Sequence, residues 1–423
     1  MAEEAPAWVT ELRLVDHHCH SVVGGELDAA AFGALLTEAH LPTVRAPAVA
    51  EPGAPEGIDP FDSKLGLAVR RECAPLLDLP RHAPAADYLA RRAELGAEEA
   101  ARRLFAASGT ELLFVDHGYR GEELLDLDAL AALAHAPVAE VVRLEAVAED
   151  LAARGVSAEA YPNALAGEIA RRAETAVACK SILAYRYGFD VAPTRPAPAE
   201  VALAAERWLG SPRGGRHSAV PGAEGRHAAA VAQGRHAAGV ADAHTDPDGR
   251  GALPLTDPVL LRHALWCGVD AGLPLQIHTG FGDSDEDLHR ANPALLTAFC
   301  RATQDTGTPI VLLHCYPYHR EAAWLAQVFR HVYFDVSLAS SYAGHRASEL
   351  LAEALELAPF GKLLYASDAF GLPELYLIAA RGFRRSLAEV LGGWIASGEA
   401  TEEDARRVAG MLAAGNARRL YRV

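Results

Sequence analysis

The sequence predicts an α/β protein built as a (β/α)8 TIM barrel, with a helical insertion after the first strand and a low-complexity insertion between the fourth and fifth. Short, almost continuously apolar runs recur eight times, which is typical of parallel strands buried on both faces. Amphipathic helical segments separate several of these runs. No glycine-rich GxGxxG turn follows the first run, which disfavours an open dinucleotide-binding sheet.

The predicted elements can be placed in order along the chain. The eight strands cover residues 12–20, 111–118, 138–147, 176–186, 273–280, 309–315, 331–337 and 362–368. Helical patterns over 260–272, 293–307 and 320–330 precede the fifth, sixth and seventh strands. Two helices are expected after the last strand, and Thr401 and Asp404 have the spacing of a capping box at the start of the second.

Two segments interrupt the alternation. Residues 35–108 lie between the first two strands and look helical, which predicts a helical insertion. Residues 193–255 are rich in Ala, Gly, Pro and His, and this composition predicts a flexible insertion that buries little apolar area. Its three Gly-Arg-His triplets, which contain His217, His227 and His236, are weaker candidates for a metal site. The whole chain is otherwise interpreted as a single barrel domain, residues 1–423.

Composition narrows the classes of function. The chain has 56 acidic and 39 basic residues and a formal charge of −17, so a nucleic-acid partner is not expected. No apolar run reaches the roughly 20 residues of a membrane span. The acidic start MAEEAPAWVT has no apolar signal region, and six scattered cysteines form no disulfide framework. We expect a cytoplasmic protein that acts on a small molecule; the sequence leaves open whether it forms a homo-oligomer.

Polar side chains close several of the apolar strands. In a parallel barrel the carboxyl ends of the strands carry the reactive groups. His18 and His20 end the first strand and, being two residues apart, project from one face of it. His278, His314 and Asp368 end the fifth, sixth and eighth strands. Imidazoles and a carboxylate gathered in this way predict a centre for one or two divalent metals, with Zn²⁺ the first choice and Mn²⁺ or Fe²⁺ the alternatives.

Lys180 lies inside the fourth strand of a chain that has only three lysines. A buried lysine is usually deprotonated or paired. Three roles therefore stay open: carbamylation by CO2 to bridge two metals, a hydrogen-bonding or electrostatic role at the metal site, or a structural pair with a carboxylate such as Glu145. Asp116 and Asp335 end the second and seventh strands, where they can orient metal ligands.

Further polar residues near strand ends are candidates for substrate binding. Arg143 and Glu145 lie two apart in the third predicted strand, so they share a face and either contact substrate or form a structural ion pair. Tyr185 and Arg186 end the fourth predicted strand. The planar guanidinium of Arg186 suits a substrate carboxylate, which it can bind through two parallel hydrogen bonds.

Five motifs carry a resemblance to a known family. VDHHCH, KSILAYRYGFDV, PLQIHTGFGD, LLHCYP and LLYASDAFGLPELY, in this order, resemble the amidohydrolase superfamily. More narrowly, they resemble its amidohydrolase-related group and the FluG-like branch of that group. The resemblance covers all eight predicted strands and the C-terminal NARRLYRV, but not residues 193–255.

The resemblance implies a role for each site residue. The implied metal ligands are His18, His20 and His278. Asp368 would touch the metal and act as the base toward the attacking water. His314 would bind a second metal if Lys180 bridges the two, and would otherwise orient or polarise the substrate.

The expected activity is metal-assisted hydrolysis of an amide C–N bond in a small carboxylated molecule. The FluG-like resemblance makes a γ-glutamyl amide the first substrate to consider. The metal would lower the pKa of water and polarise the carbonyl, while a carboxylate moves the proton to the leaving amine. Two alternatives stay open, a metal-dependent decarboxylase of the same group and a non-catalytic signalling protein. The intact set of polar residues argues against the second.

Overall fold

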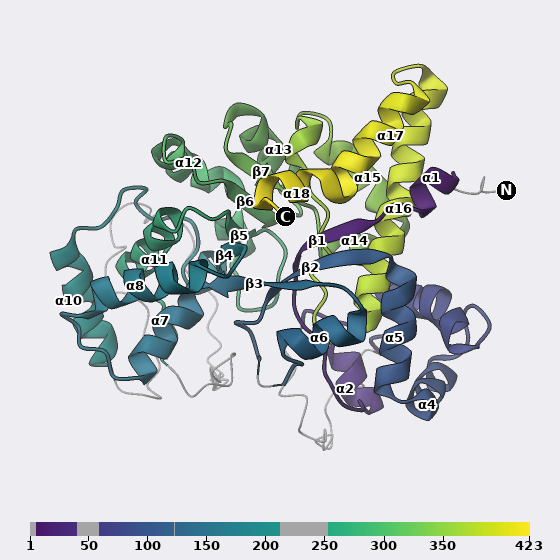
Figure 1. Cartoon of the computed structure of the whole chain (residues 1–423), viewed down its shortest axis with the longest axis horizontal. Coiled ribbons are helices and arrows are strands. Elements are labelled where there is room, and N and C mark those ends of the chain that lie inside the picture. The colour runs from purple at the N-terminus through teal and green to yellow at the C-terminus, as the bar shows by residue number, and fades with distance from the viewer. Residues whose placement is uncertain (1–5, 40–58, 122, 212–252) are drawn as a thin grey trace, which may run out of the picture.

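The computed structural model describes residues 6–39, 59–121, 123–211 and 253–423. Seven parallel strands form one sheet in which neighbours in the chain are neighbours in space (Figure 1). They are β1 (Leu14–Cys19), β2 (Thr110–Asp116), β3 (Val138–Arg143), β4 (Ala178–Ser181), β5 (Leu275–Thr279), β6 (Ile310–His314) and β7 (Val332–Phe334). Each lies within, or one residue from, a predicted strand.

The segment predicted as the eighth strand, residues 362–368, closes the barrel between β7 and β1. The backbone N–H of Leu364 donates to the carbonyl of Phe334 on β7 (3.0 Å). On the other side, the N–H of His17 on β1 donates to the carbonyl of Tyr365 (3.2 Å). The segment is extended but lacks regular strand pairing. The predicted α/β barrel is confirmed, with this segment in the place of the eighth strand.

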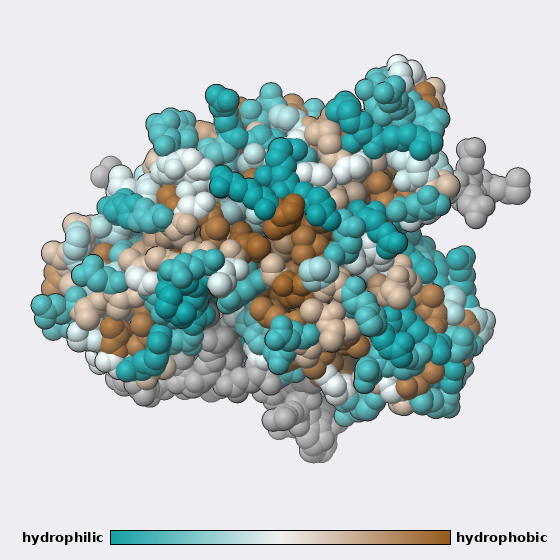
Figure 2. All heavy atoms as spheres, in the orientation of Figure 1, coloured by the Kyte–Doolittle hydropathy of each residue, from teal (hydrophilic) through white to brown (hydrophobic). Residues whose placement is uncertain are grey.

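Both faces of the strands are buried, which explains why their sequences are continuously apolar rather than alternating. In β6, Ile310 and Leu312 belong to a core cluster shared with the surrounding helices. Val311 and Leu313 belong to a second cluster inside the barrel. On the face seen in Figure 2, apolar surface gathers near the strands and hydrophilic surface surrounds it.

Helices surround the strands and follow them in the chain. They are α1 (Ala7–Thr10), α2 (Ala29–Ala34), α3 (Lys64–Ala68), α4 (Ala85–Leu95), α5 (Ala97–Ser108), α6 (Leu127–Ala134), α7 (Leu144–Ala153), α8 (Tyr161–Ala173), α9 (Leu183–Arg186), α10 (Pro198–Leu209), α11 (Pro258–Asp270), α12 (Thr297–Thr303), α13 (His319–Val328), α14 (Ala339–Ala343), α15 (Ala347–Ala354), α16 (Pro373–Ser397), α17 (Glu402–Gly410) and α18 (Asn416–Tyr421). The helices predicted before β5, β6 and β7 are confirmed as α11, α12 and α13. The capping box is also confirmed, because the hydroxyl of Thr401 accepts from the N–H of Asp404.

Among the described residues, no helix is long and apolar enough to cross a membrane.

Most of the described residues between β1 and β2 are helical, as predicted. Helices α2 to α4 share a separate apolar cluster that includes Phe32, Leu65 and Tyr88. Helix α5 packs against α6 and against the long α16, as Figure 1 shows. Residues 40–58 of the predicted insertion at 35–108 lie outside the described residues. Whether this region is an insertion in a common barrel stays a prediction.

The expectation of a flexible insertion at 193–255 is wrong for its first part, which forms helix α10. Trp208 donates its indole N–H to the carbonyl of Pro254 (3.1 Å), which ties the helix to the chain before α11. The buried face of the helix consists partly of alanines. Because the whole segment is rich in alanine, the amphipathic pattern is hard to recognise in the sequence. Residues 212–252, with all three Gly-Arg-His triplets, lie outside the described residues. The buried residues of α10 are Val201, Ala204, Ala205 and Trp208.

The C-terminal helix α18 supports the interior of the barrel. Leu420 and Tyr421 belong to the interior cluster, in which Tyr421 packs edge-on against Phe114 of β2. Asn416, at the start of α18, donates from its side-chain amide to the carbonyls of Phe360 and Leu363, both at 2.7 Å. The end of the chain therefore holds the start of the closing segment that leads to Asp368.

Replacing Asn416 by Leu should destabilise this closure. The two carbonyls would lose their donor, and a buried polar group left without a partner costs about 1–3 kcal/mol. We expect the free energy of unfolding, measured by urea denaturation, to fall by about 2–6 kcal/mol. Thr401→Ala, which removes only a helix cap on the surface, should cost about 1 kcal/mol. A loss no larger than that of the control would contradict this role of Asn416.

Candidate metal centre

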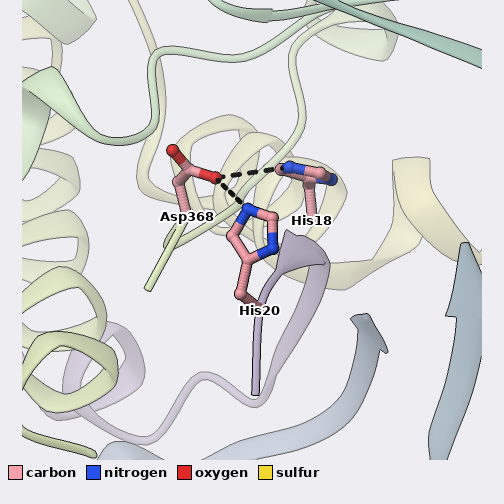
Figure 3. Close-up of side chains that lie close together, drawn as sticks. All are labelled: His18, His20 and Asp368. Atoms are coloured by element: carbon pink, nitrogen blue, oxygen red, sulfur yellow. Dashed lines mark ion pairs between the residues drawn. The ribbon is translucent and has the colours of Figure 1, made fainter. Parts of the chain in front are cut away.

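Three of the predicted ligands converge on one point at the carboxyl end of β1 (Figure 3). Asp368 Oδ1 lies 3.3 Å from His18 Nε2 and 3.7 Å from His20 Nε2. The ligand atoms of the three residues all lie within 4.8 Å of one another. His18 is buried in β1, His20 follows the strand directly, and Asp368 ends the closing segment. Two imidazoles and a carboxylate in this arrangement fit a divalent transition metal.

His314 and His278 extend the same cluster along the sheet. His314 Nδ1 lies 3.5 Å from Asp368 Oδ2, and its ring centroid lies 5.7 Å from that of His18. The ring of His278 lies 4.6 Å from that of His314. The structure thus brings all five predicted histidine and aspartate residues together. A sixth group, Glu286, was not predicted, and its Oε2 lies 2.8 Å from His278 Nε2.

Hydrogen bonds to the outer ring nitrogens fix the tautomers of His18 and His20. His18 Nδ1 lies 2.8 Å from the side-chain oxygen of Gln276, and His20 Nδ1 lies 2.8 Å from the backbone oxygen of Asp116. Both oxygens can only accept, so each Nδ1 carries the proton. Each Nε2 therefore carries a lone pair, which is the form in which histidine binds a metal; at His18 a metal would take the place of the hydrogen bond from Lys180 Nζ.

Burial keeps these imidazoles neutral. It lowers the pKa of His20 to about 4 and that of His278 to about 3, and it holds the pKa of His18 and His314 well below the ordinary value. Burial also raises the pKa of Asp368. Neutral imidazoles need not lose a proton before they bind a cation. The donor set therefore fits a metal in charge as well as in geometry.

Lys180 lies beside the ligands, next to a buried ion pair. Its Nζ donates to His18 Nε2 at 3.0 Å and lies 4.0 Å from Asp116 Oδ2. Arg143 binds Asp116 Oδ2 through Nε (2.9 Å) and Nη2 (2.8 Å). Burial lowers the pKa of Lys180 to about 8, which raises the share of neutral amine at neutral pH. That is the form that reacts with CO2, so carbamylation stays a prediction, alongside an electrostatic role.

The prediction that Arg143 and Glu145 share a strand face is wrong. Strand β3 ends at Arg143, and Glu145 lies in the first turn of helix α7. The buried carboxylate of Glu145 accepts from the hydroxyl of Ser181 (2.6 Å) and from the N–H of Ile182 (3.1 Å). These bonds hold the chain just after β4. The apolar run continues through the turn into α7, so the sequence pattern shows no end to the strand.

Two site residues have a positive φ, a backbone conformation that residues other than glycine rarely adopt. His314 has φ = 67° and Asp368 has φ = 52°. Such conformations cost of order 1–3 kcal/mol each and persist where the surroundings hold them. The N–H of His314 donates to the carboxylate of Asp335 (2.8 Å), and the N–H of Asp368 donates to the carbonyl of His18 (3.1 Å). The two hydrogen bonds hold the side chains at the centre.

The predicted substrate-binding residues after β4 divide into two environments. The ring of Tyr185 lies 4.3 Å from that of His278, which places Tyr185 at the centre. Arg186 Nη2 instead lies 3.2 Å from Oε1 of the buried Glu149. The guanidinium of Arg186 is thus engaged by a carboxylate of the protein, and its role as a substrate anchor stays a prediction.

Two acidic residues near the centre were missed by the sequence analysis. Glu38 accepts from the hydroxyl of Tyr342 at 3.1 Å, and burial raises its pKa to about 7. Burial likewise raises the pKa of Glu286 to about 8. Both residues lie in connections that follow β1 and β5, well beyond the strand ends. No apolar strand leads directly into them, so they lacked the signal that marked the other site residues.

The fold and the centre together define a class of protein, the metal-dependent barrel enzymes with ligands at the carboxyl ends of their strands. The comparisons give the family. The model of the amidohydrolase family matches residues 15–423, and the chain belongs to that family. The protein fluG of Emericella nidulans is 39% identical over 150 residues, which are 35% of this chain and 17% of that protein. The chain therefore matches less than a fifth of the length of fluG.

Solved structures agree with this fold over almost the whole chain. A protein from Lactobacillus casei, named for a metal-dependent hydrolase, is 27% identical with a TM-score of 0.74 over 98% of this chain and 96% of its own. A uronate isomerase from Thermotoga maritima is 14% identical with a TM-score of 0.56, over 98% and 96% of the two chains. The second likeness concerns the fold alone.

The purified protein should contain a transition metal. We expect about one to two equivalents of Zn²⁺, Mn²⁺ or Fe²⁺ per chain after purification without chelator, because nitrogen ligands favour these ions over Ca²⁺ and Mg²⁺. Elemental analysis measures the content. His20→Ala removes one convergent Nε2 and should lower it several-fold, whereas His331→Ala, away from the centre, should not. Wild-type protein that neither contains nor takes up metal would contradict the assignment.

The affinity for metal should depend only weakly on pH. Protons compete with metals for imidazole nitrogens, but His20 and His278 are neutral well below pH 6.5. Between pH 6.5 and 5, we expect log Kd for Zn²⁺ to rise by about one per pH unit or less, from protonation of Asp368. Three imidazoles with an ordinary pKa would make log Kd rise by up to about three per pH unit. Competition with a chromophoric chelator measures the slope, and a value near three would contradict the burial of the ligands.

Proposed function

We propose that this protein is a metal-dependent hydrolase that cleaves an amide C–N bond in a small carboxylated substrate, with a γ-glutamyl amide the first to test. The position of Asp368 carries the proposal. One of its oxygens contacts the Nε2 atoms of two imidazoles, and the other faces His314. A carboxylate so placed can act both as a metal ligand and as a proton carrier. The name of the Lactobacillus casei relative and the partial match to fluG add support.

The residues that would hold the metal are His18, His20 and Asp368, with His278 beside them. When bound, a divalent metal polarises the amide carbonyl and lowers the pKa of water. Asp368 is placed to take a proton from the attacking water and to deliver it to the leaving amine, which departs poorly without one. Burial raises the pKa of Asp368, and a carboxyl group with a raised pKa returns a proton more readily near neutral pH.

The other side chains of the centre position the substrate in this proposal. His314 donates from Nδ1 to Ser337, so its Nε2 is left to accept a hydrogen bond from the substrate. Lys180, as an ammonium, would stabilise negative charge that develops on the carbonyl oxygen. If carbamylated, it would instead supply a carboxylate as a metal ligand, and His314 would be a ligand of a second metal. Tyr185 packs on His278 and would form one wall of the pocket. To anchor the substrate carboxylate, Arg186 would have to give up its ion pair with Glu149.

Asp368→Asn should lower kcat by about 10²–10⁴, because an amide of the same size cannot carry the proton. The measurement is steady-state amine release from γ-glutamyl amides and other N-acyl amides by metal-loaded protein, with metal content determined for each preparation. Asp270→Asn, a surface change in a pair with Arg195, is the matched control and should keep wild-type kcat.

The products decide between reaction classes. Amine and carboxylic acid in equal amounts support the hydrolase. Release of CO2 without amine from an aromatic or other carboxylic acid would replace it with a decarboxylase, and interconversion of sugar acids without loss of any group would replace it with an isomerase. An Asp368→Asn variant that holds metal and retains full activity would overturn the assigned role of this carboxylate.

A further inference from the structure

A buried hydrogen-bond network lies beneath the metal centre and joins two of its imidazoles. We propose that Gln276 and Tyr421 are positioning residues of this centre: through them, the last helix of the chain fixes the tautomer and orientation of the metal ligand His18. Neither residue belongs to the group of candidate ligands His18, His20 and Asp368. Gln276 lies on β5, and Tyr421 lies two residues before the end of the chain.

The direction of each hydrogen bond around Gln276 follows from chemistry. The amide nitrogen of Gln276 lies 2.7 Å from the carbonyl oxygen of His17, which can only accept. The amide nitrogen therefore donates, and it donates also to the hydroxyl of Tyr421 at 2.9 Å. The amide oxygen then faces His18 Nδ1 and accepts its proton. This leaves His18 Nε2 as the metal-binding nitrogen.

The network continues from Tyr421 to the other side of the barrel. The hydroxyl of Tyr421 accepts from Gln276, so its own proton is available to His17 Nδ1 at 3.1 Å. His17 must then carry its proton on Nε2, which lies 3.0 Å from Asp335 Oδ2. His17 is therefore the opposite tautomer to its neighbour His18.

Asp335 completes the connection to the second imidazole. Its Oδ1 accepts from the hydroxyl of Ser337 at 2.6 Å. Because that hydroxyl gives its proton to Asp335, its oxygen accepts from His314 Nδ1 at 2.8 Å. His18 and His314 thus both carry their proton on Nδ1, and one chain of polar contacts specifies both.

Burial makes this network costly to disturb. His17, Gln276 and Asp335 are fully buried, and Tyr421 is 6% exposed. Water is therefore not at hand to replace a lost partner, and a group left unpaired favours a different rotamer or tautomer. Groups that orient a metal-binding histidine typically contribute 10–100-fold to metal affinity. The aromatic ring of Tyr421 packs on Phe114, so a change to Phe keeps the packing and removes only the hydroxyl.

The first test compares two variants that each remove one buried hydroxyl. Tyr421→Phe removes the hydroxyl of the network. Tyr161→Phe removes one that lies buried in the outer core and has no hydrogen-bond partner among the residues that the structure describes. Kd for Zn²⁺ and Co²⁺ is measured by chelator competition, with Tm recorded for each protein. We expect Kd to rise about 10-fold or more for Tyr421→Phe, with an altered visible spectrum of the Co²⁺ protein, and to stay unchanged for Tyr161→Phe. An unchanged Kd for a folded Tyr421→Phe, or an equal rise for both variants, would overturn the proposal.

The second test uses the wild-type chain and does not depend on any variant folding. In metal-free protein labelled with ¹⁵N-histidine, ring ¹H–¹⁵N correlation spectra report which nitrogen carries the proton. The network requires Nδ1–H for His18 and His314 and Nε2–H for His17; any other assignment overturns it. The inference rests on the proposed metal centre but not on the proposed substrate. An inactive amide screen therefore leaves it standing, and the tautomers are read without metal or substrate.

Discussion

The metal centre depends on one backbone contact, the hydrogen bond from the N–H of Asp368 to the carbonyl of His18. It joins the last strand-like segment of the barrel to the first strand. Because the two segments are separated by almost the whole chain, their carboxyl ends meet only when the barrel closes. Closure then sets the carboxylate of Asp368 against His18 and His20. Binding of metal and completion of the fold are therefore linked.

Burial supplies the electrostatic character of the centre. A metal cation is attracted by a carboxylate but competes with any proton on an imidazole, and burial removes that competition by lowering the pKa of each histidine. The same burial would destabilise Lys180 as a cation, and Asp116 nearby offsets that cost. Arg143 in turn keeps Asp116 ionised. The site thus places two cations, Lys180 and Arg143, which share the carboxylate of Asp116, beside neutral imidazoles.

Much of the fold and of the centre could be predicted from the sequence because several strands end in a polar residue. An apolar run buried on both faces leaves a polar residue at its terminus conspicuous, as with His278 and Asp368. Gln276 is also a polar residue inside a buried strand, but the histidine two residues later gives the stronger signal. Glu286 and Tyr421 had no such signal, because a loop residue and an aromatic residue of an amphipathic helix look ordinary.

The sequence by itself determined the barrel, the order of its strands and which residues face one another at their carboxyl ends, since these follow from local periodicity and parallel pairing. Only the tertiary structure decided which partner each side chain takes. Strand β1 shifts register against β2 between Asp16 and Cys19, and both adjacent histidines, His17 and His18, reach the interior network. Strict alternation along a strand would have separated them. The partners of Arg186 and Glu145 were likewise set by long-range packing of α7, which no pattern within β3 or β4 contains.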